Sequence, residues 1–410
     1  MTEKRNITKE DVLLKARLLS EGVRLEAKET LQWGKATQDE VSGVPTIVFD
    51  DCDVVSKIRV NPRSCLEVLF EGNDVTILDM GEVLGTATLR ERAPWRDIAM
   101  SDGATVNNAI AYDGGFVAMI VVANRCHTYD SGKGCKFCGF AHTFAQTGPV
   151  LSAEDTIRIG RRQIDALAIA IQNGWRGTVL LVGGATAPER RGKWTTDLFE
   201  AHMEYLHKSV DNDVLSQLQI ASDVYPPDDL EDLYKWKRFG INSCQFDSQV
   251  MDPAYFRAIC PGRGDQKRWH EVQEAAAEVF GRGRGSSSLL VTGIEPMARM
   301  MEGIEERVSK GVYIQPTTFA PFPNSPMAGM NPPSAEWYVE AAERIVDIYF
   351  RYADTFDVDL TEDDRWGYTR RGNSYESIAD DEKSRRLQEM GKLPPGLPKQ
   401  DGIEMPKTSL

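Results

Sequence analysis

Short apolar runs alternate with longer amphipathic stretches through the middle of the chain, and this pattern predicts an α/β fold. The apolar runs, read as strands, cover residues 116–123, 178–182, 215–221, 241–247, 286–292 and 312–319. Stretches with helical periodicity cover residues 152–173, 195–209, 228–238, 266–281, 296–310 and 334–352. Six successive strand–helix units favour a parallel sheet, either open or curled into a barrel by right-handed crossovers.

The two ends of the chain have a different character. Residues 1–111 are expected to hold one helix, over residues 8–32, and a small β-rich region with strands at 44–49, 56–60, 65–70 and 75–79. Residues 112–355 hold the strand–helix units. Residues 356–410 lose the periodicity and are rich in charge and proline, so we expect a polar, partly disordered C-terminal tail.

Composition narrows the class of protein. The chain has 410 residues, of which 41% are hydrophobic, enough for a sizeable core. Its 48 basic and 62 acidic residues give a net charge of −14, which argues against a nucleic-acid partner. No run approaches the ~18 apolar residues of a membrane span. The charged N-terminus has no hydrophobic signal segment, so we expect a cytoplasmic protein with no membrane partner.

Three of the seven cysteines lie on one loop directly after the first predicted strand. Cys126, Cys135 and Cys138 follow a C-x8-C-x2-C spacing, with Gly132 and Gly134 between them. In a cytoplasmic chain, clustered thiols indicate metal binding or catalysis rather than disulfides. Three thiolates can hold a zinc ion with a fourth ligand, or an iron–sulfur cluster that keeps one iron open to a small ligand.

This ligand set leaves three classes of protein open. One is an enzyme that uses the open iron. The second is a non-catalytic iron–sulfur or structural zinc protein, with His127 or His142 as the fourth ligand, and the third is a zinc-dependent hydrolase on a barrel. The remaining cysteines are expected to be buried thiols without a ligand role: Cys52, Cys65, Cys244 and Cys260.

The cysteine loop resembles that of the radical S-adenosylmethionine (SAM) superfamily. The commonest motif there is C-x3-C-x2-C with an aromatic residue before the last cysteine, and Cys135, Phe137 and Cys138 match its second half. The first spacing departs from it, because eight residues lie between Cys126 and Cys135 instead of three. The similarity runs from about residue 112 to 350 and is closest to the group around biotin synthase and its lyase and mutase relatives. It implies a partial (β/α)6 TIM-like barrel, a [4Fe-4S] cluster on the three cysteines, and SAM as a second cofactor.

The loop after the second predicted strand resembles a SAM-binding element. Gly183, Gly184 and Ala185 stand where the family has Gly-Gly-Glu, whose backbone meets the amino group of the methionine part of SAM. Ala185 removes the carboxylate, and Thr186 is the side chain expected to compensate. The alternative is a tight strand–helix turn, for which two glycines are equally suited.

Polar groups near the ends of later strands match other parts of the family pattern. Gln245 and Asp247 resemble the pair that meets the ribose hydroxyls of SAM. Arg263 and Arg268 resemble the segment whose arginine pairs with the methionine carboxylate, and Glu295 resembles the acid near the adenine. Each has a structural alternative: an acid that caps a helix or pairs with a core arginine, a solvated basic face, or an acid favoured by a helix dipole.

The later strands are expected to contact the substrate. Tyr313, Gln315 and Thr317 alternate along the sixth predicted strand and so share one face, while Gln219 and Asp223 belong to the end of the third strand. This lining predicts a small polar substrate. The aromatic, proline-rich loop 319–326 is expected to close the mouth of the barrel.

By resemblance, the reduced cluster cleaves SAM to a 5′-deoxyadenosyl radical, which takes a hydrogen atom from the substrate. Rearrangement, C–C cleavage or radical addition are the reactions expected, since the sequence has no evident cobalamin-binding domain or ligand set for a second cluster. The implied partners are a small-molecule substrate and a low-potential electron donor such as flavodoxin or ferredoxin. The N-terminal region is a candidate surface for a homodimer.

Overall fold

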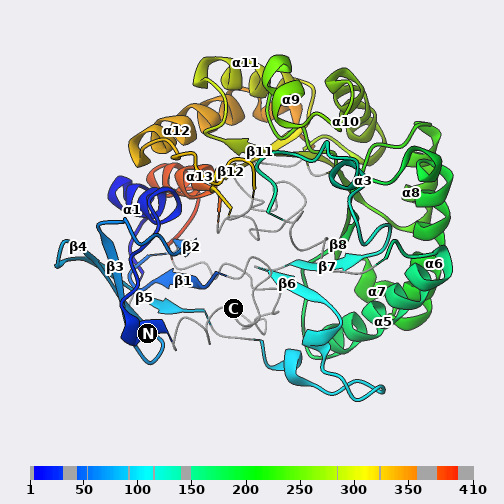
Figure 1. Cartoon of the computed structure of the whole chain (residues 1–410), viewed down its shortest axis with the longest axis horizontal. Helices are drawn as coiled ribbons and strands as arrows, with labels where there is room; N and C mark the ends of the chain where they lie inside the picture. The colour runs from blue at the N-terminus through cyan, green and yellow to red at the C-terminus, as the bar shows by residue number, and fades with distance from the viewer. Residues whose placement is uncertain are drawn as a thin grey trace.

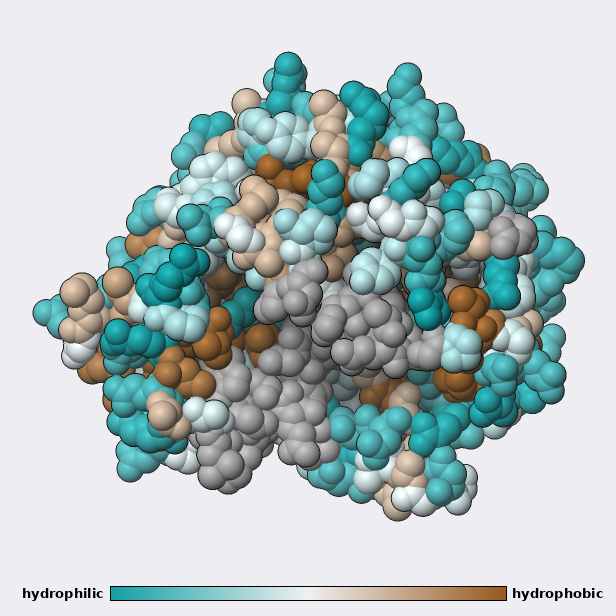
Figure 2. All heavy atoms as spheres, viewed as in Figure 1, coloured by the Kyte–Doolittle hydropathy of each residue, from teal (hydrophilic) through white to brown (hydrophobic). Residues whose placement is uncertain are grey.

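The chain forms two sheets and a set of helices (Figure 1). The computed structural model describes residues 4–30, 44–52, 54–90, 93–113, 116–139, 149–283, 285–322, 325–357 and 376–395 of the 410. One sheet has seven strands and the other has five. On the face shown in Figure 2, hydrophilic side chains cover most of the periphery. Among the helices described, none combines the length and the apolar character that a membrane crossing needs.

The seven-stranded sheet carries the predicted repeat. Its spatial order is β12-β11-β10-β9-β8-β7-β6, so strands adjacent in sequence are adjacent in the sheet. All its pairs are parallel except the antiparallel pair of β6 and β7. The sheet curls into half a barrel with helices around its outside (Figure 1), which confirms the predicted α/β partial barrel. The strands are β6 Ala111–Asp113, β7 Phe116–Ile120, β8 Thr178–Val182, β9 Gln219–Asp223, β10 Ser243–Gln245, β11 Ser286–Thr292 and β12 Tyr313–Thr318.

The barrel helices begin and end at residues that the sequence marks. Ser152 caps α5 by accepting a hydrogen bond from the Asp155 amide. Gly240 ends α8 with a φ of 102°, a backbone conformation that favours glycine. The third strand begins at Gln219 rather than at residue 215, because the preceding residues still form the short helix α7. The helices are α3 His127–Asp130, α5 Ala153–Gln172, α6 Lys193–Ser209, α7 Asn212–Leu215, α8 Glu231–Phe239, α9 Pro253–Ile259, α10 Gln266–Phe280, α11 Met297–Ser309 and α12 Ala335–Arg351.

The N-terminal region forms helix α1 (Lys9–Ser20) and an antiparallel sheet of order β2-β1-β5-β4-β3. Thr8 caps α1, but the helix ends far short of residue 32, since Gly22 adopts a φ of 68° against the carbonyl of Arg59. Four strands were predicted, and β5 is an additional one. The strands are β1 Thr46–Phe49, β2 Val55–Lys57, β3 Leu66–Glu71, β4 Asp74–Asp79 and β5 Glu82–Leu89.

The N-terminal region shares its apolar core with one end of the barrel. A single buried cluster includes Val12 of α1, Ile47 of β1, Ile314 of β12 and Ile345 of α12. A second cluster fills the space between the rest of the parallel sheet and its outer helices. Short 3-10 turns lie at Ala27–Glu29, Pro94–Asp97, Val106–Asn108, Pro188–Arg190 and Ala353–Thr355.

Part of the expected C-terminal tail is an ordered helix, α13 (Ile378–Glu389). This differs from the expectation of an aperiodic tail, although residues 358–375 and 396–410 lie outside the described residues. Helix α13 packs against α1 and α12, and Lys15 forms a fully buried ion pair with Asp381. Its buried side chains include charged ones such as Asp381 and Glu382 beside apolar ones such as Ile378, so hydrophobic periodicity did not reveal it.

Candidate cluster and cofactor site

The cluster loop, which we define as residues 125–139, follows the carboxyl end of β7. Cys126 is the N-cap residue of α3, and its sulfur lies 3.0 Å from the Thr128 hydroxyl. The amide of Cys138 donates to the carbonyl of Cys135 across 3.2 Å, so these two cysteines lie on one tight turn. The loop is therefore at the edge of the sheet where barrel enzymes carry their active sites.

The turn after β8 packs directly against the start of the cluster loop. A Cβ added at Gly184 would lie 2.5 Å from the carbonyl oxygen of Arg125 and 2.8 Å from the Cα of Cys126. The amide of His127 donates to the carbonyl of Ala185 across 2.7 Å. Only glycine allows backbone to approach backbone this closely, so the turn is built to hold the cluster loop and is more than a simple connection.

The other end of the cluster loop packs against the segment between α9 and α10. The amide of Lys136 donates to the carbonyl of Ile259 across 2.9 Å. A Cβ added at Gly262 would lie 2.5 Å from the Cβ of Thr128. The cluster loop is therefore held on both sides, by the turn after β8 and by the segment after α9.

The thiol of Cys135 has two neighbours that favour its ionised form. A hydrogen bond from Cys260 and the positive charge of Arg263 lower the pKa of Cys135 to about 6, although burial opposes them. The same contact with Cys135 raises the pKa of Cys260. Thiolates rather than thiols bind iron and zinc, so Cys135 is prepared to act as a metal ligand at neutral pH.

Arg263 lies between the cluster loop and the end of β10. Its guanidinium donates to the carbonyl of Asp247 across 2.5 Å and stacks over the ring of Trp269, 4.4 Å from the ring centre. The hydroxyl of Tyr225 and the indole N–H of Trp269 donate to the Arg263 carbonyl at 2.8 and 3.0 Å. These contacts hold the guanidinium where it interacts with both Cys135 and Asp247.

Two carboxyl groups approach this arginine from the ends of β9 and β10. Burial and the nearby Asp247 raise the pKa of Asp223 well above its ordinary value, against the attraction of Arg263. Burial also raises the pKa of Asp247 to about 6, although its carboxylate accepts from the Leu289 amide across 2.9 Å. Gln245 hydrogen-bonds to both acids. Its Oε1 is buried and accepts no hydrogen bond within the part of the chain that the structure describes.

Two predicted cofactor residues lie apart from this group. Arg268 donates to two backbone carbonyls of the loop before α8, at 2.8 and 2.9 Å. Glu295 accepts two backbone amides of the segment after β10, at 2.7 and 2.6 Å. Phe137, next to Cys138, packs against the main core, and Thr186 is buried beside the glycine turn.

Of the predicted substrate residues, Asp223 is the one that the described contacts join to the cofactor group. Tyr313 and Thr317 donate hydrogen bonds to acids of the C-terminal segment, at 3.2 and 3.4 Å. Gln315 lies between them on the same face of β12. Gln219, fully buried at the start of β9, accepts from a threonine of β8 across 3.4 Å.

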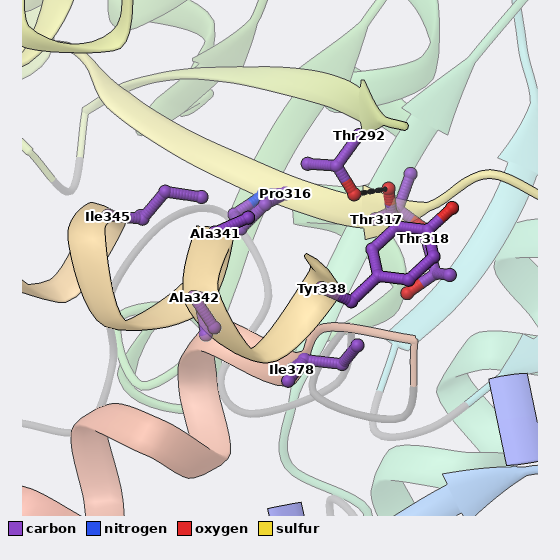
Figure 3. A pocket seen from close by; sticks show the side chains of 10 residues that line it. Thr292, Pro316, Thr317, Thr318, Tyr338, Ala341, Ala342, Ile345 and Ile378 are labelled. Atoms are coloured by element: carbon purple, nitrogen blue, oxygen red, sulfur yellow. Dashed lines mark hydrogen bonds between the residues drawn. The ribbon is translucent and has the colours of Figure 1, made fainter. Parts of the chain in front are cut away.

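A small hollow lies between β12, α12 and α13 (Figure 3). The side chains of Thr317, Thr318 and Tyr338 gather at one end of it, and apolar side chains such as Ile345 line the other. The hydroxyl of Thr292 donates to the Thr317 carbonyl across 2.9 Å. This hollow includes no residue of the cluster loop, so it is separate from the cofactor group.

Phe322 connects the cluster loop to the N-terminal region. A Cβ added at Gly139 would lie 2.6 Å from the Phe322 ring, and the Arg59 guanidinium lies 5.2 Å from the ring centre. Arg59 also pairs with Glu376 at 3.1 Å. The sequence pointed to the loop around Phe322, but gave no signal for Arg59 or Glu376. No pattern in the sequence indicated that Cys260 contacts Cys135, although Cys260 lies close to Arg263 along the chain.

Potential metal ligands also gather outside the cluster loop. Among the described residues, one group of three ligand atoms lies within 4.8 Å, formed by Asp11, Asp51 and Cys52, and Arg5 pairs with both of its acids. The three sulfurs of the cluster loop do not all lie within that distance of one another. His142, one of the proposed fourth zinc ligands, lies outside the described residues.

Comparison with known proteins identifies a full-length relative. The chain is 40% identical over 407 residues to bacteriochlorophyllide c C-7(1)-hydroxylase from Chlorobaculum limnaeum, across 97% of this chain and 100% of that protein. No family model matches the chain.

Similar solved structures are much more distant. The FeFe-hydrogenase maturase HydG from Carboxydothermus hydrogenoformans has 15% identity and a TM-score of 0.41, across 58% of this chain and 52% of that one. Methylornithine synthase (PylB) has 15% identity and a TM-score of 0.38, across 72% of this chain and 87% of that one. These likenesses are too weak to support an argument, so the assignment depends on the full-length relative. The chain belongs, with that hydroxylase, to the radical SAM superfamily of enzymes.

Proposed function

We propose that this enzyme is a radical SAM hydroxylase that acts on an exocyclic carbon of a bacteriochlorophyllide. The observation that carries the proposal is the 40% identity to a bacteriochlorophyllide hydroxylase along the whole of both chains. The likeness spans the N-terminal sheet as well as the barrel.

Cys126, Cys135 and Cys138 are the proposed ligands of a [4Fe-4S] cluster. The lowered pKa of Cys135, caused by its hydrogen bond with Cys260 and the charge of Arg263, supports this assignment. When bound, the reduced cluster and SAM would supply a radical that takes a hydrogen atom from the substrate carbon. The resulting carbon radical would return one electron to the oxidised cluster, and water would supply the hydroxyl oxygen and release a proton. The turn at Gly183 and Gly184 holds the loop in place from one side.

The remaining groups are proposed to hold SAM. Arg263 offers a fixed guanidinium to the methionine carboxylate, and Gln245 and Asp247 offer acceptors to the ribose hydroxyls. The unpaired Oε1 of Gln245 supports this role, because a buried acceptor without a partner is unfavourable until a ligand donates to it. Contacts of SAM with Ala185 and Thr186 remain part of the proposal. Those with Phe137, Arg268 and Glu295 remain proposals too, although the last two already bond to backbone groups.

A second candidate is a small polar substrate that undergoes rearrangement, C–C cleavage or radical addition. The polar side chains on the strands favour it: the buried Gln219, Tyr313 and Gln315, and the partly buried Asp223 and Thr317. In either case a flavodoxin or ferredoxin in the cytoplasm is the proposed electron donor, and a homodimer is the proposed assembly.

Anaerobic reconstitution with iron and sulfide tests the proposal. We expect a brown protein that, with dithionite, converts SAM to 5′-deoxyadenosine and methionine. Adding bacteriochlorophyllide c should then give a product heavier by one oxygen atom, identified by mass spectrometry. The Cys135→Ala variant is the control and should give neither product. Deoxyadenosine formation that responds to small polar metabolites but not to the macrocycle would favour the second candidate. A fully loaded cluster that never cleaves SAM would contradict both.

A further inference from the structure

The glycine turn after β8 lacks an acidic side chain. Ala185 stands where the resembling family has glutamate, and its carbonyl is already used by the His127 amide at 2.7 Å. The neighbouring Thr186 offers a hydroxyl but no charge, and it is 5% exposed. The turn itself therefore provides no anionic acceptor for an amino group.

Asp223 lies one strand away from this turn. In the parallel pairing of β8 with β9, Asp223 lies opposite Val182, and the Asp223 carbonyl accepts a hydrogen bond from the Gly183 amide across 3.3 Å. Ala221, two residues earlier, packs with Leu180 and Val182 in a small cluster apart from the outer core. Because alternate strand residues share a face, Asp223 points to the concave side with Ala221.

The charges around Asp223 are unbalanced without a ligand. Asp223, which is partly buried, and the buried Asp247 share one cation, Arg263, and Gln245 adds a buried carbonyl oxygen without a donor. Like charges placed together in a buried site are unfavourable, and a donor or cation that enters the site relieves them. The surplus of acceptors therefore fits a ligand that brings hydrogen-bond donors.

The two charged sides match the two ends of an α-amino acid. Arg263, which interacts with Cys135, suits a carboxylate. Asp223, beside the turn that touches Cys126, suits an amino group. We propose that Asp223 accepts hydrogen bonds from the amino group of the methionine part of SAM, in place of the acid that position 185 lacks. This inference rests on SAM being the cofactor, as in the proposed function.

Binding measurements on the reconstituted enzyme test this role without turnover. Affinity is measured anaerobically by equilibrium dialysis for SAM and for the analogue that lacks the α-amino group. We expect Asp223→Asn to weaken SAM binding about tenfold or more, the effect of losing a hydrogen bond to a charged group. The same variant should bind the analogue as the parent enzyme does. The change in the EPR spectrum of the reduced cluster on SAM addition should weaken in parallel.

A compensating variant separates a specific contact from a general disturbance. Adding Ala185→Glu to Asp223→Asn should restore preference for SAM over the analogue, because the acid returns at the neighbouring position. Equal loss of affinity for both ligands, or unchanged affinity for SAM in Asp223→Asn with full iron content, would overturn the inference. A parent enzyme that binds SAM but does not hydroxylate the macrocycle contradicts only the proposed function. A parent that binds no SAM contradicts both.

Discussion

Replacing Arg263 by methionine should raise the pKa of Cys135 in the cluster-free protein. The pKa of Cys135 is lowered from 9.0 to about 6 by the hydrogen bond from Cys260 and by Arg263, against the effect of burial. Methionine keeps much of the side-chain volume but removes both the charge and the donor. Since one unit of pKa corresponds to about 1.4 kcal/mol of thiolate stabilisation, the full shift is worth about 4 kcal/mol. We expect the pKa of Cys135 to be at least about one unit higher in Arg263→Met than in the parent protein.

Alkylation of Cys135 by iodoacetamide, followed peptide by peptide with mass spectrometry, measures this pKa. The quantity to compare is the pH at which the alkylation rate reaches half its maximum. A rate at one pH is less informative, because a thiolate of higher pKa is also a better nucleophile and this partly hides the loss of ionised fraction. The parent midpoint should lie near 6. In the variant, the ionised fraction at neutral pH falls, so the midpoint moves upward.

Two control variants make the measurement specific. Arg263→Lys keeps the charge and should shift the midpoint less than methionine does. Arg268→Met is the second control. In the described contacts, Arg268 donates to two backbone carbonyls and to one exposed acid, so its loss should leave the midpoint for Cys135 unchanged. A parent midpoint close to 9, or the same midpoint in the parent and Arg263→Met proteins, would refute the reasoning.

Three further outcomes are expected. Gly184→Ala should reduce the iron bound after reconstitution, because the added Cβ meets backbone 2.5 Å away, whereas Gly329→Ala, with open space around it, should not. Lys15→Met should lower the free energy of unfolding in urea by about 3–5 kcal/mol by removing the cation that pairs with the buried carboxylate of Asp381, and adding Asp381→Leu should recover most of this loss. Although burial opposes it, two cationic neighbours lower the pKa of Glu376 from 4.5 to about 2. The stabilisation from this carboxylate is present above pH 4.5 and lost toward pH 2, so Glu376→Gln should lower the melting temperature at pH 7 and not near pH 2.

Local patterns made the barrel predictable. The six parallel strands follow from apolar runs, and helix starts such as Ser152 follow from capping residues. The meeting of Asp247, Arg263 and Cys135 could be expected from their positions beyond strand ends, since parallel strands end at one edge of the sheet. These predictions required only sequence spacing and the rules for crossovers.

Contacts between distant segments were not predictable in this way. Helix α13 buries charged side chains, including the pair of Lys15 and Asp381, beside a few apolar ones such as Ile378, so the apolar stripe that marks most helices is weak in it. The stacking of Arg59 on Phe322 joins two loops from different regions. Such contacts depend on how the N-terminal sheet sits against the barrel, which no local pattern specifies.

The ion pair of Lys15 with Asp381 has a consequence for the order of events during synthesis. The two residues are 366 positions apart, so Lys15 leaves the ribosome long before its partner exists. An ammonium group without a counter-charge is costly to bury, so α1 cannot reach its final position until the last part of the chain emerges. The cluster loop, at residues 125–139, is synthesised well before that segment. The N-terminal helix therefore completes its packing against α12 and α13 only after the barrel and the C-terminal helix have been made.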